Sequence, residues 1–550
     1  MKDRDYQKEQ EELQKKLEEN LYNRNFRGFG MDLNPVVSIA SGAFILVFSL
    51  FALLNLEYAN LLFERTKNAI ITNFDWVFIL SSNFFIIVCL YFAFSKLGNV
   101  RIGGVDSEAE FSNFAWYSML ISAGMGIGLM FWAVGEPLYH SQFLPPIYDN
   151  VDSVHGAMAT TFFHWGLHPW GIYALISLAL AFFAYNRKLP LSLRSVFYPL
   201  LGDKVFGIIG DIIDTLAVLS CLFGLATSLG LGVQQINSGL NYLIGITISV
   251  PIQVVLIAII TGLAVISVVS GLDKGVKFLS ELNIKIAFVF MLAVFLIGPS
   301  AYILRLFSNS LGTYLNGFIQ SSFFIAINEK TWQGSWSVFY LAWWISWSPF
   351  VGMFIARISK GRTIREFVLA VLIVPSLLSF MWLTVFGGTA IHINTISDGQ
   401  LFNVVDNNLP VALFEMISLL NIPLLAGLLR VILSLLGTLL VISFFITSSD
   451  SGSLVVDNIT SGGKLDSPVP QRVFWACMEG LVAAVLLVIG GEKALSALQA
   501  AVISTGLPFA IILTIMSISL IKSVKRSHKR QKKIRDINHF RTIMNVLKKK

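Results

Sequence analysis

Charged side chains are scarce in this sequence. Asp, Glu, Lys and Arg make up 13% of its 550 residues, whereas soluble domains usually contain about 25%. Hydrophobic residues account for 55%, and the mean hydropathy is +0.71. So few charges exclude a soluble multidomain enzyme and a nucleic-acid-binding protein. The composition predicts an integral membrane protein.

Cysteine is also rare. Cys89, Cys221 and Cys477 all lie in apolar stretches, which excludes a secreted disulfide scaffold and indicates packing rather than a redox pair. The first 30 residues contain seven basic and seven acidic side chains and no apolar core, so we expect no signal peptide. Residues 1–33 are expected to form a cytoplasmic arm, either a solvated helix or a disordered segment.

Apolar runs separated by polar breaks predict an all-α membrane protein with twelve spans, because one span needs about 20 apolar residues. The predicted spans are 34–56, 75–95, 112–138, 156–186, 206–242, 250–271, 279–303, 333–357, 364–389, 423–455, 471–490 and 495–521. Two further stretches, 304–331 and 402–420, mix Leu, Phe and Ile with Asn, Ser and Asp. We expect them to lie along the outer membrane surface, with ordinary periplasmic loops as the alternative.

Basic residues are distributed unevenly between the predicted connections. Connections on one side, with the adjoining helix ends, contain 14 Lys and Arg, and those on the other side contain five. This asymmetry predicts that both termini are cytoplasmic and that the protein lies in the inner membrane. Residues 522–550 hold 12 Lys and Arg and one acid, Asp536. We expect this tail to lie on anionic lipid; nucleic-acid binding is the weaker alternative.

The third predicted span contains the run Gly124-Met125-Gly126-Ile127-Gly128. A dinucleotide site needs such glycines between a strand and a helix, with water around the phosphates, which a mid-membrane apolar run excludes. Two interpretations stay open: close helix packing through small residues, and a broken helix whose freed backbone groups face a cavity. Each glycine costs a helix about 1 kcal/mol relative to Ala, which favours the broken helix.

Five of the twelve tryptophans fall in two short windows of the fourth and eighth spans. The aromatic residues of these windows include Trp165, Trp170, Tyr173, Trp343, Trp344 and Trp347. Tryptophan usually collects at membrane interfaces, but Trp344 and Trp347 fall near mid-depth of their span. Core packing is the other alternative. Indole faces suit a quaternary ammonium, which has no N–H to donate, at about 2 kcal/mol per ring when water is excluded.

Three motifs resemble those of the betaine/choline/carnitine transporter family. They are Gly124-Met125-Gly126-Ile127-Gly128-Leu129-Met130-Phe131-Trp132 followed by Gly135-Glu136-Pro137, then Trp343-Trp344-Ile345-Ser346-Trp347-Ser348-Pro349-Phe350-Val351-Gly352, and Arg357-Ile358-Ser359-Lys360-Gly361-Arg362-Thr363-Ile364-Arg365-Glu366-Phe367. The resemblance covers about residues 30 to 520. It implies a transporter domain over 34–521 with a LeuT-like core, in which spans 3–7 and 8–12 are inverted repeats behind two additional spans. It also implies a homotrimer.

The resemblance further implies where the solute binds. The family's aromatic box falls on four residues, and three more line the path to it: Trp165, Trp170, Tyr173 and Trp344, then Trp343, Trp347 and Phe339. The glycine run, represented by Gly124, Met125, Gly126 and Gly128, would meet a carboxylate through its freed amides. Some choline-selective relatives carry an acid at the last glycine position, so the uncharged Gly128 favours a zwitterion such as glycine betaine.

For the coupling ion, the resemblance implies sodium. Its site would use backbone carbonyls of Ser122 and Met125 and the tenth-span residues Phe444, Thr447 and Ser448. The alternative is that these hydroxyls only bond back to carbonyls one turn earlier. Residues 216–240 contain no Lys or Arg, whereas sodium-independent relatives have a fixed cation in this span, so sodium is favoured. Beyond sodium, no cofactor is expected.

Two further ion sites are less favoured. Cys221 and Leu225 replace the two threonines that flank Phe-Gly in relatives with a second sodium site, so the sequence does not favour a second site. Proton coupling ranks second to sodium, because it requires a buried acid near the membrane midplane. The acids considered fall nearer helix ends: Asp214, Glu281 and Asp450.

The sequence therefore predicts a sodium-coupled symporter for a quaternary-ammonium or related onium solute, above all glycine betaine. Choline, carnitine and dimethylsulfoniopropionate stay open as substrates, and the basic tail is either a topology anchor or a device for osmotic activation. A channel would need rings of like charge or a repeated filter, and the sequence shows neither. An enzyme would need a convergent His, Asp and Glu set, and His164 and His168 have no acid on their own helix.

Overall fold

The structure is a computed structural model that describes residues 12–124, 126–148, 151–270, 275–421, 426–464 and 466–547. Nearly all described elements are helices. The exception is an antiparallel hairpin of β1 (Phe26–Gly28) and β2 (Met31–Leu33), in which Arg27 faces Asp32. Its turn residues Phe29 and Gly30 both have positive φ, +52° and +72°, as a two-residue hairpin turn requires. The sequence analysis did not predict this hairpin.

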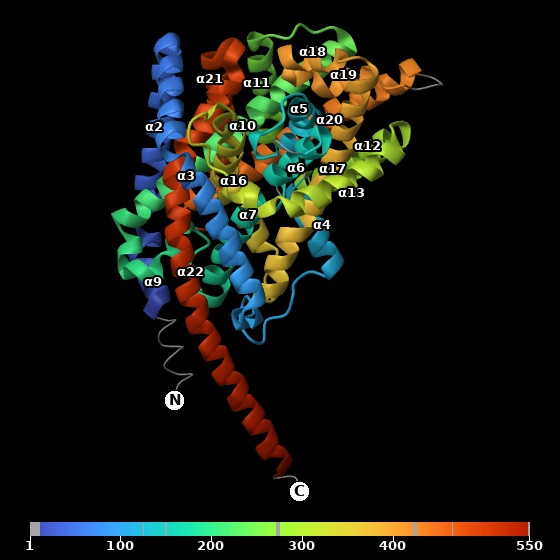
Figure 1. Ribbon diagram of the computed structural model, residues 1–550. Helices are drawn as coiled ribbons and strands as arrows, with labels where there is room; N and C mark the ends of the chain where they lie inside the picture. Colours follow the sequence, from blue (N-terminus) through green and yellow to red (C-terminus); the bar gives the residue numbers. More distant parts are fainter. Residues whose placement is uncertain are drawn as a thin grey trace.

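Long apolar helices form the body of the molecule (Figure 1). They are α2 (Pro35–Leu54), α3 (Leu56–Phe94), α10 (Ile208–Ile244), α11 (Val250–Ser270), α12 (Gly275–Ile297), α16 (Phe339–Arg357), α17 (Ile364–Ile396), α20 (Ala426–Thr460), α21 (Val469–Gly490) and α22 (Ala494–Leu547). Two predicted spans are each divided into two helices, α4 (Asn113–Gly124) with α5 (Ile127–Gln142) and α6 (Ser153–Trp165) with α7 (Leu167–Ala181). A multi-pass membrane protein is therefore confirmed.

The number of membrane spans depends on how the bent helix pairs are counted. Among the described residues, nine helical segments are long and apolar enough to cross a membrane, or eleven if each of two bent pairs counts as one span. The longest segment, Val469–Arg530, contains α21 and much of α22. Twelve spans and the inverted repeat stay predictions.

Short helices connect the long ones. The α-helices are α8 (Leu193–Val196), α9 (Tyr198–Leu201), α13 (Ser300–Asn316), α14 (Phe318–Phe323), α15 (Thr331–Gln333), α18 (Gln400–Asn407) and α19 (Ala412–Ser418). Tighter or wider turns are Tyr22–Arg24, Lys96–Asn99, Pro146–Tyr148, Phe182–Asn186, Gly202–Phe206, Gly334–Val338, Leu409–Val411 and Gly491–Lys493. The two stretches predicted along the membrane surface contain helices, and α13 is turned by 108° from the segment Glu281–Ile297. Their position relative to lipid stays a prediction.

Polar side chains determine where several spans begin. The Asn34 side chain accepts hydrogen bonds from the amides of Val36 and Val37, at 3.1 and 3.2 Å, before α2. Asp152 does the same for α6, and Thr363 accepts from the Glu366 amide at the start of α17. These groups satisfy amides that the first helical turn leaves unpaired.

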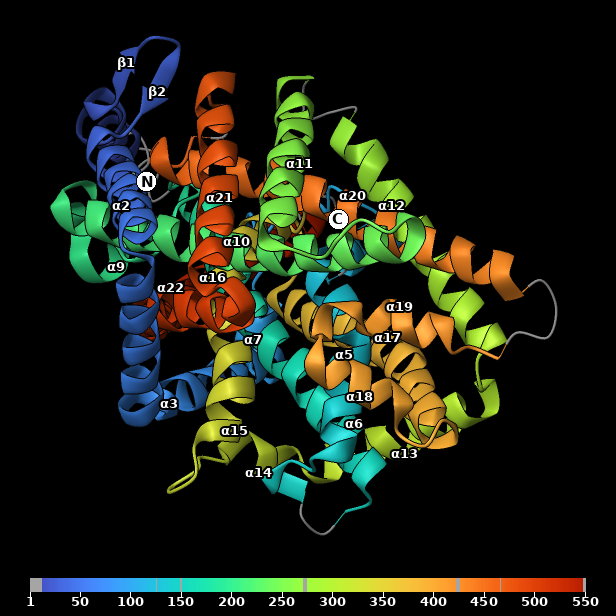
Figure 2. The same cartoon turned by 90° about the horizontal axis from the view of Figure 1, so that it is seen from above.

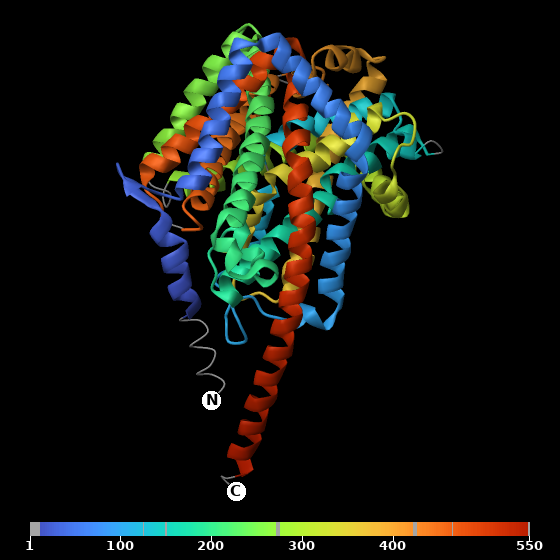
Figure 3. The same ribbon diagram turned by 90° about the vertical axis from the view of Figure 1, so that its left-hand side faces the viewer.

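The arrangement of helices places the interrupted spans inside the bundle. Seen from above, α7 and α16 lie side by side, with α5, α6 and α17 next to them (Figure 2). In a side view, the helical residues 12–20 and the C-terminal half of α22 extend from the same end of the molecule (Figure 3). Because α22 is one helix to Leu547, the predicted tail from 522 continues the last span without a break in the helix.

Candidate functional site

The third predicted span is broken at its glycine run. Helix α4 ends at Gly124, α5 begins at Ile127, and the two are bent by 61°. Gly126 between them is extended, with φ −170° and ψ −174°. The first amides of α5 have no carbonyl one turn earlier, so the positive end of its helix dipole faces the break. The broken-helix prediction is confirmed; Met125 lies outside the described residues.

The glycines also allow close approach of aromatic rings. A β-carbon on Gly124 would lie 2.8 Å from the Trp170 ring, and one on Gly128 would lie 2.9 Å from Trp343 and 3.0 Å from Trp165. On Gly126 the nearest atom, in Trp347, would be 3.9 Å away. Two glycines of the run are therefore needed for packing, so both interpretations of the run apply to it.

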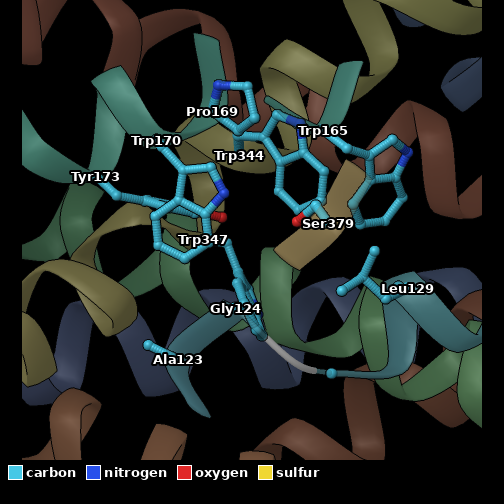
Figure 4. A pocket seen from close by; sticks show the side chains of 12 residues that line it. Ala123, Gly124, Leu129, Trp165, Pro169, Trp170, Tyr173, Trp344, Trp347 and Ser379 are labelled. Carbon is cyan, nitrogen blue, oxygen red and sulfur yellow. The ribbon is translucent and has the colours of Figure 1, made fainter. Parts of the chain in front are cut away.

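A cavity lies beside the break. The indole rings of Trp165, Trp170 and Trp344 lie on one side of it, and Ala123 and Gly124 lie on the other, with Trp347 beside Gly124 (Figure 4). It is lined by Ala123, Gly124, Gly126, Gly128, Leu129, Trp165, Pro169, Trp170, Tyr173, Trp344, Trp347 and Ser379. The structure therefore brings the glycine run and five of the predicted aromatic residues to one place.

The aromatic rings meet edge to face. Trp165 and Trp344 have centroids 4.9 Å apart at 72°, and Trp170 and Tyr173 have centroids 5.3 Å apart at 77°. The Trp344 indole N–H donates to the His164 carbonyl at 2.9 Å, and the Trp165 N–H donates to Glu136 Oε2 at 2.7 Å. Since these polar edges are occupied, the ring faces are what the two tryptophans offer to the cavity.

Two predicted residues lie outside the cavity lining. Trp343 stacks on Trp344 with centroids 5.0 Å apart at 11°, and Phe339 stacks on Trp343 at 5.6 Å and 16°. The Trp343 N–H lies 3.3 Å from Ser228 Oγ. Trp343 therefore supports Trp344 from behind, and Phe339 supports Trp343 in turn. That they line the path to the cavity stays a prediction.

The predicted sodium ligands lie on two helices. Ser122 is near the end of α4, whereas Phe444, Thr447 and Ser448 are on α20. Thr447 Oγ1 donates to the Ser443 carbonyl at 3.0 Å, as the back-bonding alternative requires. A hydroxyl that donates this way still has lone pairs for a cation, so the sodium site stays a prediction.

The sequence analysis missed the acid beside the aromatic windows. Glu136 of α5 is buried, and its Oε2 accepts from Trp165 and, at 2.6 Å, from the Tyr340 hydroxyl. Its Oε1 lies 2.6 Å from His164 Nδ1. Glu136 is on α5, whereas His164 is on α6, so the acid is not on the helix of that histidine. The signal was the Gly135-Glu136-Pro137 motif on the preceding span.

A second buried acid was also overlooked. Glu479 lies at the middle of α21, and Ser449 Oγ donates to its Oε2 at 3.1 Å. Its Oε1 has no hydrogen-bond partner among the described residues. Asp450 on α20 accepts from Ser267 Oγ at 2.6 Å. A buried acid at mid-span is what proton coupling requires, and Glu479 is such an acid.

Comparisons with known proteins identify the family of the chain. The family model described as BCCT, betaine/carnitine/choline family transporter, matches residues 36–529. The chain is 48% identical over 510 residues to glycine betaine transporter 1 of Vibrio parahaemolyticus, covering 91% of this chain and 95% of that protein. A glycine betaine/proline/choline/ectoine transporter of the same organism is 46% identical, covering 91% and 89%. A glycine betaine transporter of Acinetobacter baylyi is 42% identical, covering 90% and 74%.

These matches confirm the resemblance that the glycine and tryptophan motifs indicated. They also exclude an enzyme, since family and relatives alike are transporters. The chain belongs to the betaine/carnitine/choline family of transporters.

Proposed function

We propose that this protein is a secondary symporter that takes up glycine betaine or a related onium solute together with sodium. The observation that carries the proposal is the cavity in which aromatic faces lie opposite a broken helix. The rings suit a methylated cation that donates no hydrogen bond. The start of α5 suits an anion. Glycine betaine has both groups in one molecule.

The zwitterion is favoured over choline by an uncharged glycine and two hydrogen-bond donors in the cavity lining. Gly128 lines the cavity and has no charge. Tyr173 Oη and Trp347 Nε1 are buried, and neither has a hydrogen-bond partner among the described residues. Both side chains line the cavity, and both groups are donors that a carboxylate accepts. The names of the relatives include glycine betaine in each case cited and choline in one.

Sodium is the first choice of coupling ion, and a proton is the second. Residues 216–240 of α10 contain no Lys or Arg, so no fixed cation substitutes for a mobile one in this segment. The proton alternative rests on Glu479, the buried carboxylate at the middle of α21. Both proposals require that uptake follows an ion gradient.

The setting of the protein is also proposed. We propose that it lies in the inner membrane with both termini in the cytoplasm. The predicted connections on the side of the termini contain most of the Lys and Arg residues, and the two described ends of the chain extend from the same end of the molecule (Figure 3). Family resemblance supports a homotrimer, and the basic residues after 521 support contact with anionic lipid and a role in osmotic activation.

Uptake into proteoliposomes tests the solute. We expect an inward sodium gradient to drive accumulation of labelled betaine in preference to choline, carnitine and dimethylsulfoniopropionate. Trp344→Leu should lower uptake about tenfold or more, because it removes one ring face worth about 2 kcal/mol. The control is Trp475→Phe, because Trp475 is a buried tryptophan on α21 that does not line the cavity. This variant should take up betaine at the wild-type rate. Equal uptake by Trp344→Leu and wild-type protein would contradict the proposal.

The driving ion is tested in the same vesicles. An inward sodium gradient at equal pH is compared with an inward proton gradient in potassium buffer. We expect uptake with sodium alone, unchanged in Glu479→Gln. Uptake that needs the proton gradient and is lost in Glu479→Gln would replace sodium by the second candidate.

A further inference from the structure

Three buried side chains meet at one point beside the cavity. Glu136 Oε1 lies 2.6 Å from His164 Nδ1 and 3.7 Å from His140 Nε2. One ligand atom from each residue can be chosen so that all three lie within 4.8 Å of one another. Glu136 and His140 lie in the last two turns of α5, and His164 lies in the last turn of α6.

His140 is the group that demands an explanation. It is fully buried, and neither ring nitrogen has a hydrogen-bond partner among the described residues. Buried polar groups almost always have a partner, and an ion is one explanation for those that lack one. Two imidazoles and a carboxylate are the ligand set of many zinc sites. We propose that Glu136, His140 and His164 bind a divalent transition-metal ion, of which Zn²⁺ is the type.

The surroundings fit such a site. His164 Nε2 lies 2.9 Å from Ser337 Oγ. With metal on Nδ1, the Nε2–H donates to this hydroxyl, which is the outer hydrogen bond that metal-bound histidines normally make. Aromatic rings shield the site: Trp336 lies 4.4 Å from the His140 ring and Tyr340 lies 4.8 Å from the His164 ring, centroid to centroid.

The two carboxylate oxygens of Glu136 contact different groups. Oε1 faces the histidines, whereas Oε2 accepts from Trp165 and Tyr340. A metal on Oε1 leaves the hydrogen bonds of Oε2 in place. The site thus adjoins the aromatic cavity without using a residue that lines it, and metal binding does not depend on which solute is carried.

Direct binding to the purified full-length protein tests the proposal. Equilibrium dialysis against Zn²⁺, and absorption of Co²⁺ as a spectroscopic probe, should show one bound ion per chain with a tetrahedral Co²⁺ spectrum. Long equilibration is needed, because the three ligands are buried. His140→Gln should weaken binding about tenfold or more. His155→Gln, a half-exposed histidine outside the cluster, should bind as the wild type does.

A second variant guards against misfolding as the cause of lost binding. Ser337→Ala keeps all three ligands and removes only the hydrogen bond to His164, so it should weaken binding by about 10- to 100-fold. Binding that is equal in wild type, His140→Gln and Ser337→Ala would overturn the proposal, as would no Co²⁺ spectrum in the folded wild type. Betaine uptake by the same preparations separates failure of this site from failure of the transport proposal.

Discussion

The three glycines of the broken span differ in what they must avoid. Gly124 and Gly128 touch indole rings so closely that a β-carbon would come within 3 Å, whereas Gly126 has 3.9 Å of room. Gly126 is also extended rather than left-handed, a conformation any residue adopts. In the sequence the three positions look equivalent, since nothing in the run records which rings lie opposite.

This difference makes a residue-scale prediction. Gly128→Ala pushes Trp343 and Trp165 apart, and overpacking of this kind costs about 1–3 kcal/mol. The dissociation constant for betaine, measured by tryptophan fluorescence, should therefore rise about tenfold. Gly126→Ala is the matched control and should change it less than about twofold. An equal effect of both substitutions would contradict this account of the cavity.

At the scale of elements, helix α20 carries two hydroxyl side chains, one turn apart, that make the same kind of hydrogen bond. Thr447 and Ser443 both bond to carbonyls of α20 itself, to Ser443 O and Leu440 O, each at 3.0 Å. Asn283 of α12 also reaches Thr447 Oγ1, at 3.5 Å. One helix face thus carries similar hydroxyls one turn apart, of which the proposed sodium site uses only the later one.

Comparing these two hydroxyls tests the sodium site. Thr447→Val keeps the shape of the side chain and removes the oxygen. If that oxygen binds sodium, the sodium concentration for half-maximal uptake should rise about tenfold, which corresponds to about 1.4 kcal/mol. Ser443→Ala removes a hydroxyl with a similar carbonyl bond and should leave the sodium dependence unchanged. A parallel shift in both variants would indicate a helix effect instead of a lost ligand.

At the scale of the whole molecule, polar contacts tie the N-terminal arm to distant helix ends. Lys464 Nζ lies 2.5 Å from Asp32 Oδ2. Arg24 lies 3.3 Å from Asp211 of α10, which also accepts from Arg194 at 2.9 Å. The hairpin and the N-terminal arm therefore pack against the bundle near the start of α10 and the segment that follows α20.

The Asp32 contact makes this docking sensitive to acid. Burial acts to raise the pKa of Asp32, but hydrogen bonds from Lys464 and Asn25 outweigh it, and the pKa falls below its ordinary value. The stabilisation is complete above the ordinary pKa of about 4 and is lost as the pH falls through the lowered pKa.

Asp32→Asn should thus destabilise the protein by up to about 1 kcal/mol at pH 7, since the pair is partly exposed. Thermal melting in detergent measures the difference from wild type, which should shrink below about pH 4. Glu492→Gln, an exposed carboxylate, is the control and should melt like wild type at both pH values. A difference for Asp32→Asn that persists in acid would point to lost packing.

Much of the fold and part of the site could be predicted. Predicted and observed helix ends agree within a few residues for most spans, but α3 begins at Leu56 instead of 75. Its first turns contain Glu64 and Lys67, which interrupt the apolar run. In the structure these two pair with each other, at 3.1 Å, and both hydrogen-bond to Ser496. A helix can continue through charged residues that pair with each other, whereas a prediction from hydropathy ends the span at them.

Residue order was enough to predict a membrane protein and the two aromatic windows and to favour a broken span over simple packing, because hydropathy, glycine cost and motif spacing act along the chain. Only the packed structure decided which rings line the cavity, which support Trp344 from behind, and that Glu136 lies against His140, His164 and Trp165. Those relations join different helices. Side-chain contact across helices depends on how the helices are turned and placed, and no local pattern in the sequence encodes that.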